Sequence, residues 1–101
     1  MEIKNSVIGK ECVVRGKNFG VFSGTVAEVE GDTVLLTDAR RLWYWDGAAS
    51  LSQLAMEGVK APKNCRFTVA VESIVLLGAI EIIPTTAKAE ANIKEVAEWK
   101  R

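Results

Sequence analysis

The sequence contains no histidine. This absence removes the commonest general base, a frequent metal ligand and every histidine-dependent catalytic triad. The sequence also lacks the signatures of phosphate-binding loops, dinucleotide-binding folds, serine-hydrolase elbows and calcium-binding loops. Gly16, Gly20 and Gly24 are spaced somewhat like a phosphate loop, but no GK[ST] sequence follows them, so hairpin geometry explains them better. We therefore expect a protein that is not an enzyme and that uses no metal or cofactor.

Cysteine is scarce, and charge of one sign is not in excess. Cys12 and Cys65 are the two cysteines, and they do not form a CxxC pair, so a zinc ribbon is excluded. Both lie beside strand-like apolar runs, which predicts buried free thiols. The 13 basic residues are balanced by 13 acidic residues. Proteins that bind duplex nucleic acid usually carry a basic surplus, so the composition argues against that function.

Long apolar runs are also missing. The longest, residues 74–80, is far shorter than the roughly 20 residues that a membrane span needs. Residues 1–5 lack the basic and then apolar layout of a signal peptide. We therefore expect a protein of the reducing cytoplasm with no membrane partner.

Runs of β-branched and apolar residues predict a mainly β fold. The expected strands are residues 11–15, 21–30, 33–45, 65–71 and 78–83. Gly24, inside the second of these, predicts a bulge or sharp bend. Residues 72–76 fit either a 3₁₀ turn or a continued strand, and we expect the turn.

Helix signals occur in two places. Ser50, with Gln53 three residues later, forms a capping box that predicts a helix over residues 50–58. Thr85 or Thr86 is placed to cap a second helix over about residues 87–99. The expected architecture is a five-stranded barrel of the Src-homology or Sm type over residues 1–84, with a helical insert at about 50–58 and a C-terminal helix in 85–101. An open sheet packed by the C-terminal helix is the alternative.

Residues 40–47 hold the most unusual cluster in the sequence. A strand's period of two predicts two faces, one with Arg41, Trp43 and Trp45 and the other with Arg40, Leu42 and Tyr44. One reading is plain packing, because aromatic residues are common in strands. The other is a binding site for a flat anion, since aromatic faces stack on bases and arginine grips phosphate. The candidate ligand-binding residues are Arg40, Arg41, Trp43, Tyr44 and Trp45, with Lys17, Asn18 and Arg66 as further donors.

Two segments carry a resemblance to a known family. The strings RRLWYWDGAASLSQLAMEGVK (residues 40–60) and VESIVLLGAIEIIPTT (residues 71–86) resemble a family of small uncharacterised proteins encoded by bacteriophages and prophages. The resemblance implies a viral protein acting in the host bacterial cytoplasm. It implies no activity and no site residues.

Three functions are compatible with these observations. The leading hypothesis is an anti-defence "sponge", a homo-oligomer that binds and sequesters a nucleotide-derived small molecule such as a cyclic nucleotide or a cyclic ADP-ribose-type immune signal. The second is a small barrel that binds nucleic acid, which the neutral charge disfavours. The third is a structural or interaction oligomer with no ligand, whose aromatic residues join protomers.

Overall fold

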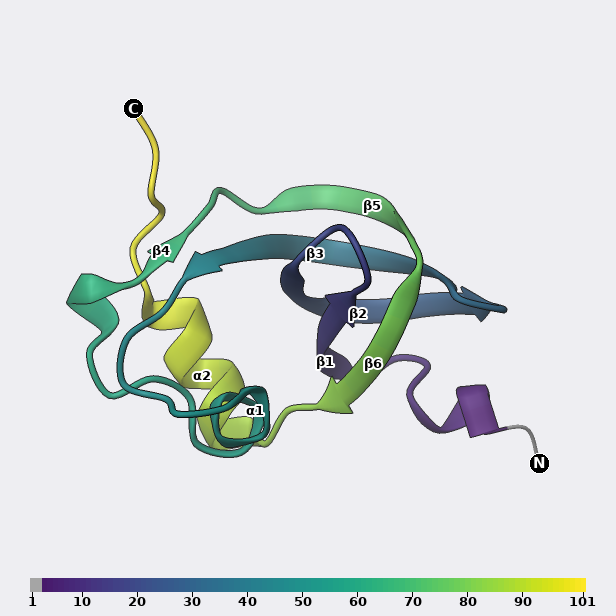
Figure 1. Ribbon diagram of the computed structural model, residues 1–101, viewed down its shortest axis with the longest axis horizontal. Coiled ribbons are helices and arrows are strands. Elements are labelled where there is room, and N and C mark those ends of the chain that lie inside the picture. The colour runs from purple at the N-terminus through teal and green to yellow at the C-terminus, as the bar shows by residue number, and fades with distance from the viewer. Residues whose placement is uncertain (1–2) are drawn as a thin grey trace.

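A computed structural model describes residues 3–101. Within this range the chain forms six antiparallel strands, two α-helices and two 3₁₀ helices. The strands are β1 (Glu11–Gly16), β2 (Val21–Glu30), β3 (Thr33–Tyr44), β4 (Arg66–Phe67), β5 (Val71–Leu77) and β6 (Ala79–Pro84). The helices are η1 (Ile3–Ser6), α1 (Leu51–Glu57), η2 (Pro62–Asn64) and α2 (Ala87–Glu95). Figure 1 shows α1 and α2 together at one end of the sheet and η1 at the other.

The predicted hairpin of β2 and β3 is the centre of the sheet. The strands pair from Glu30 and Thr33 to Phe22 and Arg41. The pairing slips between Ser23 and Thr25, which confirms the bulge predicted at Gly24. A Cβ at Gly24 would lie 3.0 Å from the carbonyl oxygen of Thr37, so glycine suits this close approach. On the opposite strand Asp38 has a φ of 49°, and this bulge changes which later residues of β3 face inward.

The predicted closed barrel is wrong, because the sheet is open. Its order is β4-β3-β2-β1-β6, and β5 also pairs with β3. β5 and β6 are joined through Gly78, whose φ is 87°. The bend sends β5 to β3 and β6 to β1, so these consecutive strands lie at opposite ends of the sheet instead of pairing (Figure 1).

The predicted strand number is also wrong, since the described residues form six strands and not five. Residues 72–76, where we expect a turn, lie within β5, because their backbone pairs with β3 in an unbroken register from Ser73 to Leu77. The strand predicted over residues 65–71 shrinks to the two residues of β4. Long-range pairing with β3 therefore overrides the local pattern here.

Both helices begin where the capping signals predict. The Ser50 hydroxyl accepts a hydrogen bond from the N–H of Gln53 at 3.1 Å, and the Gln53 side chain accepts from the N–H of Ala49 at 2.8 Å. Thr86 caps α2 by accepting from the N–H of Ala89 at 3.0 Å. α2 ends at Glu95, four residues before its predicted end. No helix among residues 3–101 is long and apolar enough to cross a membrane.

The hydrophobic residues form two clusters. One joins the sheet to the helices through residues such as Val13, Leu42, Leu54, Phe67 and Ile93. The other lies within the curl of the sheet and includes Val14, Phe22, Val26, Leu36 and Leu76. Cys65 belongs to the first cluster and Cys12 to the second, so the prediction of buried free thiols is confirmed.

Candidate functional site

The end of β3 does not keep the strict alternation that the sequence predicts. Leu42 is buried, whereas Trp43 and Tyr44 are both exposed, Trp43 by 56%. The pairing with β4 slips between Leu42 and Tyr44, which explains why two consecutive side chains reach solvent. Trp45 follows the strand and packs, partly buried, against the cluster between the sheet and the helices. Trp45 therefore serves packing.

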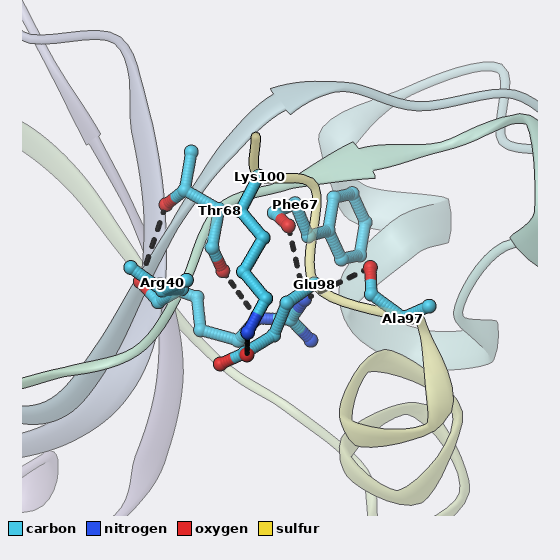
Figure 2. Close-up of polar contacts among 7 residues, drawn as sticks. Arg40, Phe67, Thr68, Ala97, Glu98 and Lys100 are labelled. Carbon is cyan, nitrogen blue, oxygen red and sulfur yellow. Dashed lines mark hydrogen bonds and ion pairs between the residues drawn. The ribbon is translucent and has the colours of Figure 1, made fainter.

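Arg40 is buried, and its guanidinium donates hydrogen bonds to backbone carbonyls (Figure 2). Its Nε donates to Thr68 O at 2.9 Å, and Nη2 donates to Phe67 O at 3.1 Å and to Ala97 O at 3.5 Å. Its Nη1 donates to Ile93 O at 3.0 Å, in the last turn of α2, where a cation offsets the helix dipole. Burial lowers the pKa of this guanidinium. Arg40 thus joins β3, β4 and α2, and we assign it a structural role instead of the predicted contact with a ligand.

Arg41 points toward the loop between β1 and β2. Its Nη1 donates to Phe19 O at 2.7 Å, and its guanidinium carbon lies 4.3 Å from the ring centroid of Phe22. Lys17 and Asn18 are exposed in the same loop. The participation of Lys17 and Asn18 in a ligand-binding site remains a prediction. The basic residue that the structure places beside Trp43 is Arg66.

Trp43, Tyr44, Arg66 and Trp99 form an exposed group that we call the aromatic–arginine surface. The Trp43 and Trp99 rings stack with centroids 5.1 Å apart at an interplanar angle of 29°. The guanidinium carbon of Arg66 lies 5.6 Å from the Trp43 ring centroid and 5.5 Å from that of Trp99. Tyr44 is paired with Arg66 across β3 and β4. The surface thus combines two indole rings and a phenol with one cation.

The C-terminal tail (residues 97–101) brings Trp99 to this surface. After α2 the chain runs alongside β4, where Glu98 forms a parallel bridge with Phe67. The N–H of Trp99 donates to Phe67 O at 2.8 Å. From the sequence, docking of Trp99 on the domain or on a neighbour is favoured over an exposed ligand platform; in the structure Trp99 stacks on Trp43 and is still 39% exposed. Its place beside Trp43 was not predicted, because it depends on the tail leaving the helix at Glu95.

The thiols of Cys12 and Cys65 are weak candidates for nucleophilic catalysis. Burial raises the pKa of the Cys12 thiol to about 11, and burial also raises the pKa of the Cys65 thiol. Neutral thiols are weak nucleophiles. Among the described residues, no group of three or more cysteine, aspartate and glutamate side chains is placed to hold a metal ion.

A second polar region surrounds Glu11 at the start of β1. Glu11 lines a cavity of about 220 Å³ together with Asp38 and Lys94, among others. Burial, which is the largest cause, and the charge of Glu90 raise the pKa of its carboxyl from the ordinary 4.5 to about 7. Lys94 opposes this shift, and Asp38 adds a smaller repulsion. Glu11 therefore makes the stability of the protein sensitive to pH.

The fold and its surface define a small, mainly β domain that carries two α-helices within the described residues. The sequence model of the family described as a domain of unknown function (DUF6948) matches residues 9–93, so the chain belongs to this family. This confirms the predicted membership of an uncharacterised family. No curated protein and no solved structure matches the chain.

Proposed function

We propose that the protein is a non-enzymatic binding protein that holds a nucleotide-derived anion on the aromatic–arginine surface. One observation carries the proposal: Arg66 lies about equally close to two partly exposed indole rings. An indole face stacks on a nucleobase, and a guanidinium binds phosphate oxygens with paired hydrogen bonds. The same small surface thus offers a partner to each half of a nucleotide.

The exposure of the groups supports this assignment. Trp43 is 56% exposed and Trp99 39% exposed, so each keeps ring surface open to a ligand while the two rings stack. Arg66 is exposed as well, and no carboxylate among the described residues forms a salt bridge with it. A phosphate that binds Arg66 therefore displaces no carboxylate partner before it forms charge-assisted hydrogen bonds with the guanidinium.

The biological role that we propose is sequestration of a signal. A binding surface without catalytic groups holds its ligand unchanged, as a sponge for an immune signal must. The ligands to test first are cyclic nucleotides and cyclic ADP-ribose isomers, since each carries a base and phosphate. Within this proposal the protein comes from a bacteriophage or prophage and acts in the host cytoplasm against defence signalling.

Titration calorimetry with this panel tests the proposal. We expect measurable binding of at least one member and a loss of affinity of about tenfold or more in Trp43→Ala and in Arg66→Ala, because stacking on one base contributes about 1–3 kcal/mol. Arg15→Ala is the matched control, since Arg15 is an exposed arginine paired with Glu81. The control should bind like the parent protein. If no member of the panel produces heat at protein concentrations well above micromolar, the proposal fails.

A second candidate is binding of single-stranded nucleic acid. The observation that favours it is the open position of Trp43 and Tyr44, both half-exposed on the surface, because stacking platforms for single strands are open. The zero net charge counts against it. Gel shifts at low salt distinguish the two functions: retention of short single strands that depends on Trp43 would replace the small-molecule proposal.

A further inference from the structure

The cavity beside Glu11 contains polar groups that have no partner within the described chain. It measures about 220 Å³ and lies where the end of α2 meets the sheet. Three neighbouring strands contribute to its lining: β1 with Glu11, β2 with Ser23 and β3 with Asp38. The side chains of these three residues form no hydrogen bond and no ion pair with residues 3–101. The cavity therefore offers free oxygen atoms from three directions.

The Ser23 hydroxyl is the most informative of these groups, because it is buried and has no partner. Ser23 is only 3% exposed, and a hydroxyl in such a place normally forms a hydrogen bond. Among the described residues, no fully enclosed side-chain oxygen or nitrogen lacks a partner. The Ser23 oxygen is therefore not fully enclosed, and the space that it reaches is the cavity that Ser23 lines. A buried hydroxyl that opens into a cavity can bind a ligand atom there.

The cations that line the same cavity already have partners. The guanidinium of Arg40 donates four hydrogen bonds to backbone carbonyls. The Nζ atom of Lys94 lies 2.9 Å from the carboxylate of Glu90. The free groups of the cavity are thus oxygen atoms, and two of the three groups are carboxylates. The complementary ligand carries a positive charge and hydrogen-bond donors.

The charges around the cavity favour a cation once Glu11 is ionised. Four carboxylates then face three cations, so negative charge is in excess. The carboxylates are Glu11, Asp38, Glu90 and Glu98, and the cations are Arg40, Lys94 and Lys100. The hydrogen bond to Glu90, and then the charges of Glu90, Glu11 and Asp38, raise the pKa of the Lys94 ammonium. An ammonium group is therefore stabilised in this part of the molecule.

A primary ammonium group fits these oxygen atoms better than a metal ion does. It has three N–H donors and no acceptor, and Glu11, Ser23 and Asp38 each offer it an acceptor. No group of three or more cysteine, aspartate and glutamate side chains among residues 3–101 is placed to hold a metal ion. The cavity is also smaller than the roughly 300–1,000 Å³ typical of sites for drug-sized ligands, which favours a short chain.

We propose that this cavity binds a primary alkylammonium group, held by Glu11, Asp38 and Ser23. Two sources carry this chemistry, a free diamine and the lysine side chain of another protein. The proposed site shares no residue with the aromatic–arginine surface, so the two proposals can fail separately.

Titration of butylammonium into the isotope-labelled protein at pH 8, followed by two-dimensional NMR, tests this site. We expect saturable shifts of the backbone amides of Glu11, Ser23 and Asp38. Glu11→Gln and Asp38→Asn should each lower the affinity about tenfold or more, because each removes a charge-assisted hydrogen bond. Ser23→Ala should lower it about threefold, because the lost hydrogen bond has a neutral acceptor.

Matched variants and ligands separate this site from a general attraction of cations. Glu57→Gln, which removes an exposed carboxylate at the end of α1, should bind like the parent protein. Butyltrimethylammonium has the same charge but no N–H donor, so it should not bind. The affinity of the parent protein for butylammonium should fall about tenfold from pH 8 to pH 6, because Glu11 gains a proton around its pKa of about 7. The affinity of Glu11→Gln should stay constant over this range.

Three results would overturn the proposal. The first is the absence of saturable shifts at butylammonium concentrations of tens of millimolar. The second is equal binding of butyltrimethylammonium, which would show that charge alone acts. The third is binding that appears only in Lys94→Met, since the protein's own lysine would then fill the cavity. Diaminobutane and acetyl-lysine amide distinguish the two sources: the tighter binder identifies the source, and either result supports the ammonium site.

Discussion

Replacing Arg40 by methionine is expected to lower the free energy of unfolding by about 3–5 kcal/mol. Methionine is of similar length but donates no hydrogen bond. The carbonyls of Phe67 and Ile93 would lose buried hydrogen bonds to a charged donor, each worth about 1.5–3 kcal/mol. The loss is a large part of the total stability of a small domain, about 5–15 kcal/mol.

Equilibrium unfolding in urea measures this loss. Arg15→Met is the control, because Arg15 forms an exposed ion pair with Glu81, and its loss should cost at most about 1 kcal/mol. Arg40→Lys should fall between the two, since it keeps the charge but not the planar fork of donors. The structural role of Arg40 would be refuted by a methionine variant that is as stable as the control.

The stability of the protein is expected to fall as the pH rises from about 4.5 to about 7, through the titration of Glu11. Its carboxyl has a raised pKa in the folded protein, so the folded state binds the proton more tightly than the unfolded state does. The resulting stabilisation is complete below the unfolded pKa of 4.5 and is lost by the time the folded pKa of about 7 is passed. Because the carboxyl is partly exposed, solvent screening limits the effect to about 1–2 kcal/mol.

Glu11→Gln isolates this contribution, because glutamine cannot ionise. The variant should be more stable than the parent protein by about 1–2 kcal/mol at pH 8 and about equally stable at pH 4. Glu57→Gln, at an exposed position at the end of α1, should leave the difference near zero at both pH values. A Glu11→Gln variant whose advantage is the same at pH 4 and pH 8 would show that desolvation of the carboxylate is not the cause.

Local sequence patterns predicted the parts of the fold that short-range chemistry determines. The hairpin of β2 and β3 follows from β-branched runs around a glycine turn, and the bulge follows from Gly24. Ser50 and Thr86 cap the helices as their side chains predict. Each of these features depends on residues within a few positions of one another.

The remaining features depend on contacts between distant segments. β5 becomes a strand through its pairing with β3, although residues 72–76 also fit a turn. Arg40, unlike Arg41, has a structural role because it donates a hydrogen bond to the carbonyl of Ile93, 53 positions away. The bulges near Asp38 and Tyr44 shift the inward face of β3, so a strict period of two cannot assign Trp43 and Trp45. The cluster itself was visible in the sequence, but the separation of its members into packing and surface residues was not.

Trp99 contributes to the aromatic–arginine surface but belongs to neither hydrophobic cluster of the domain. The match to the family ends at residue 93, whereas Trp99 lies beyond it in the tail. Besides the stacking of the Trp99 ring, two hydrogen bonds hold the tail through its backbone atoms, from Arg40 to the Ala97 carbonyl and from the Trp99 N–H to the Phe67 carbonyl, and these bonds do not depend on which side chains the tail carries. Substitution at position 99 therefore replaces one aromatic ring of the surface while both hydrophobic clusters stay intact. Under the proposed function, a change at this position alters the ligand that the surface binds without requiring the domain to refold.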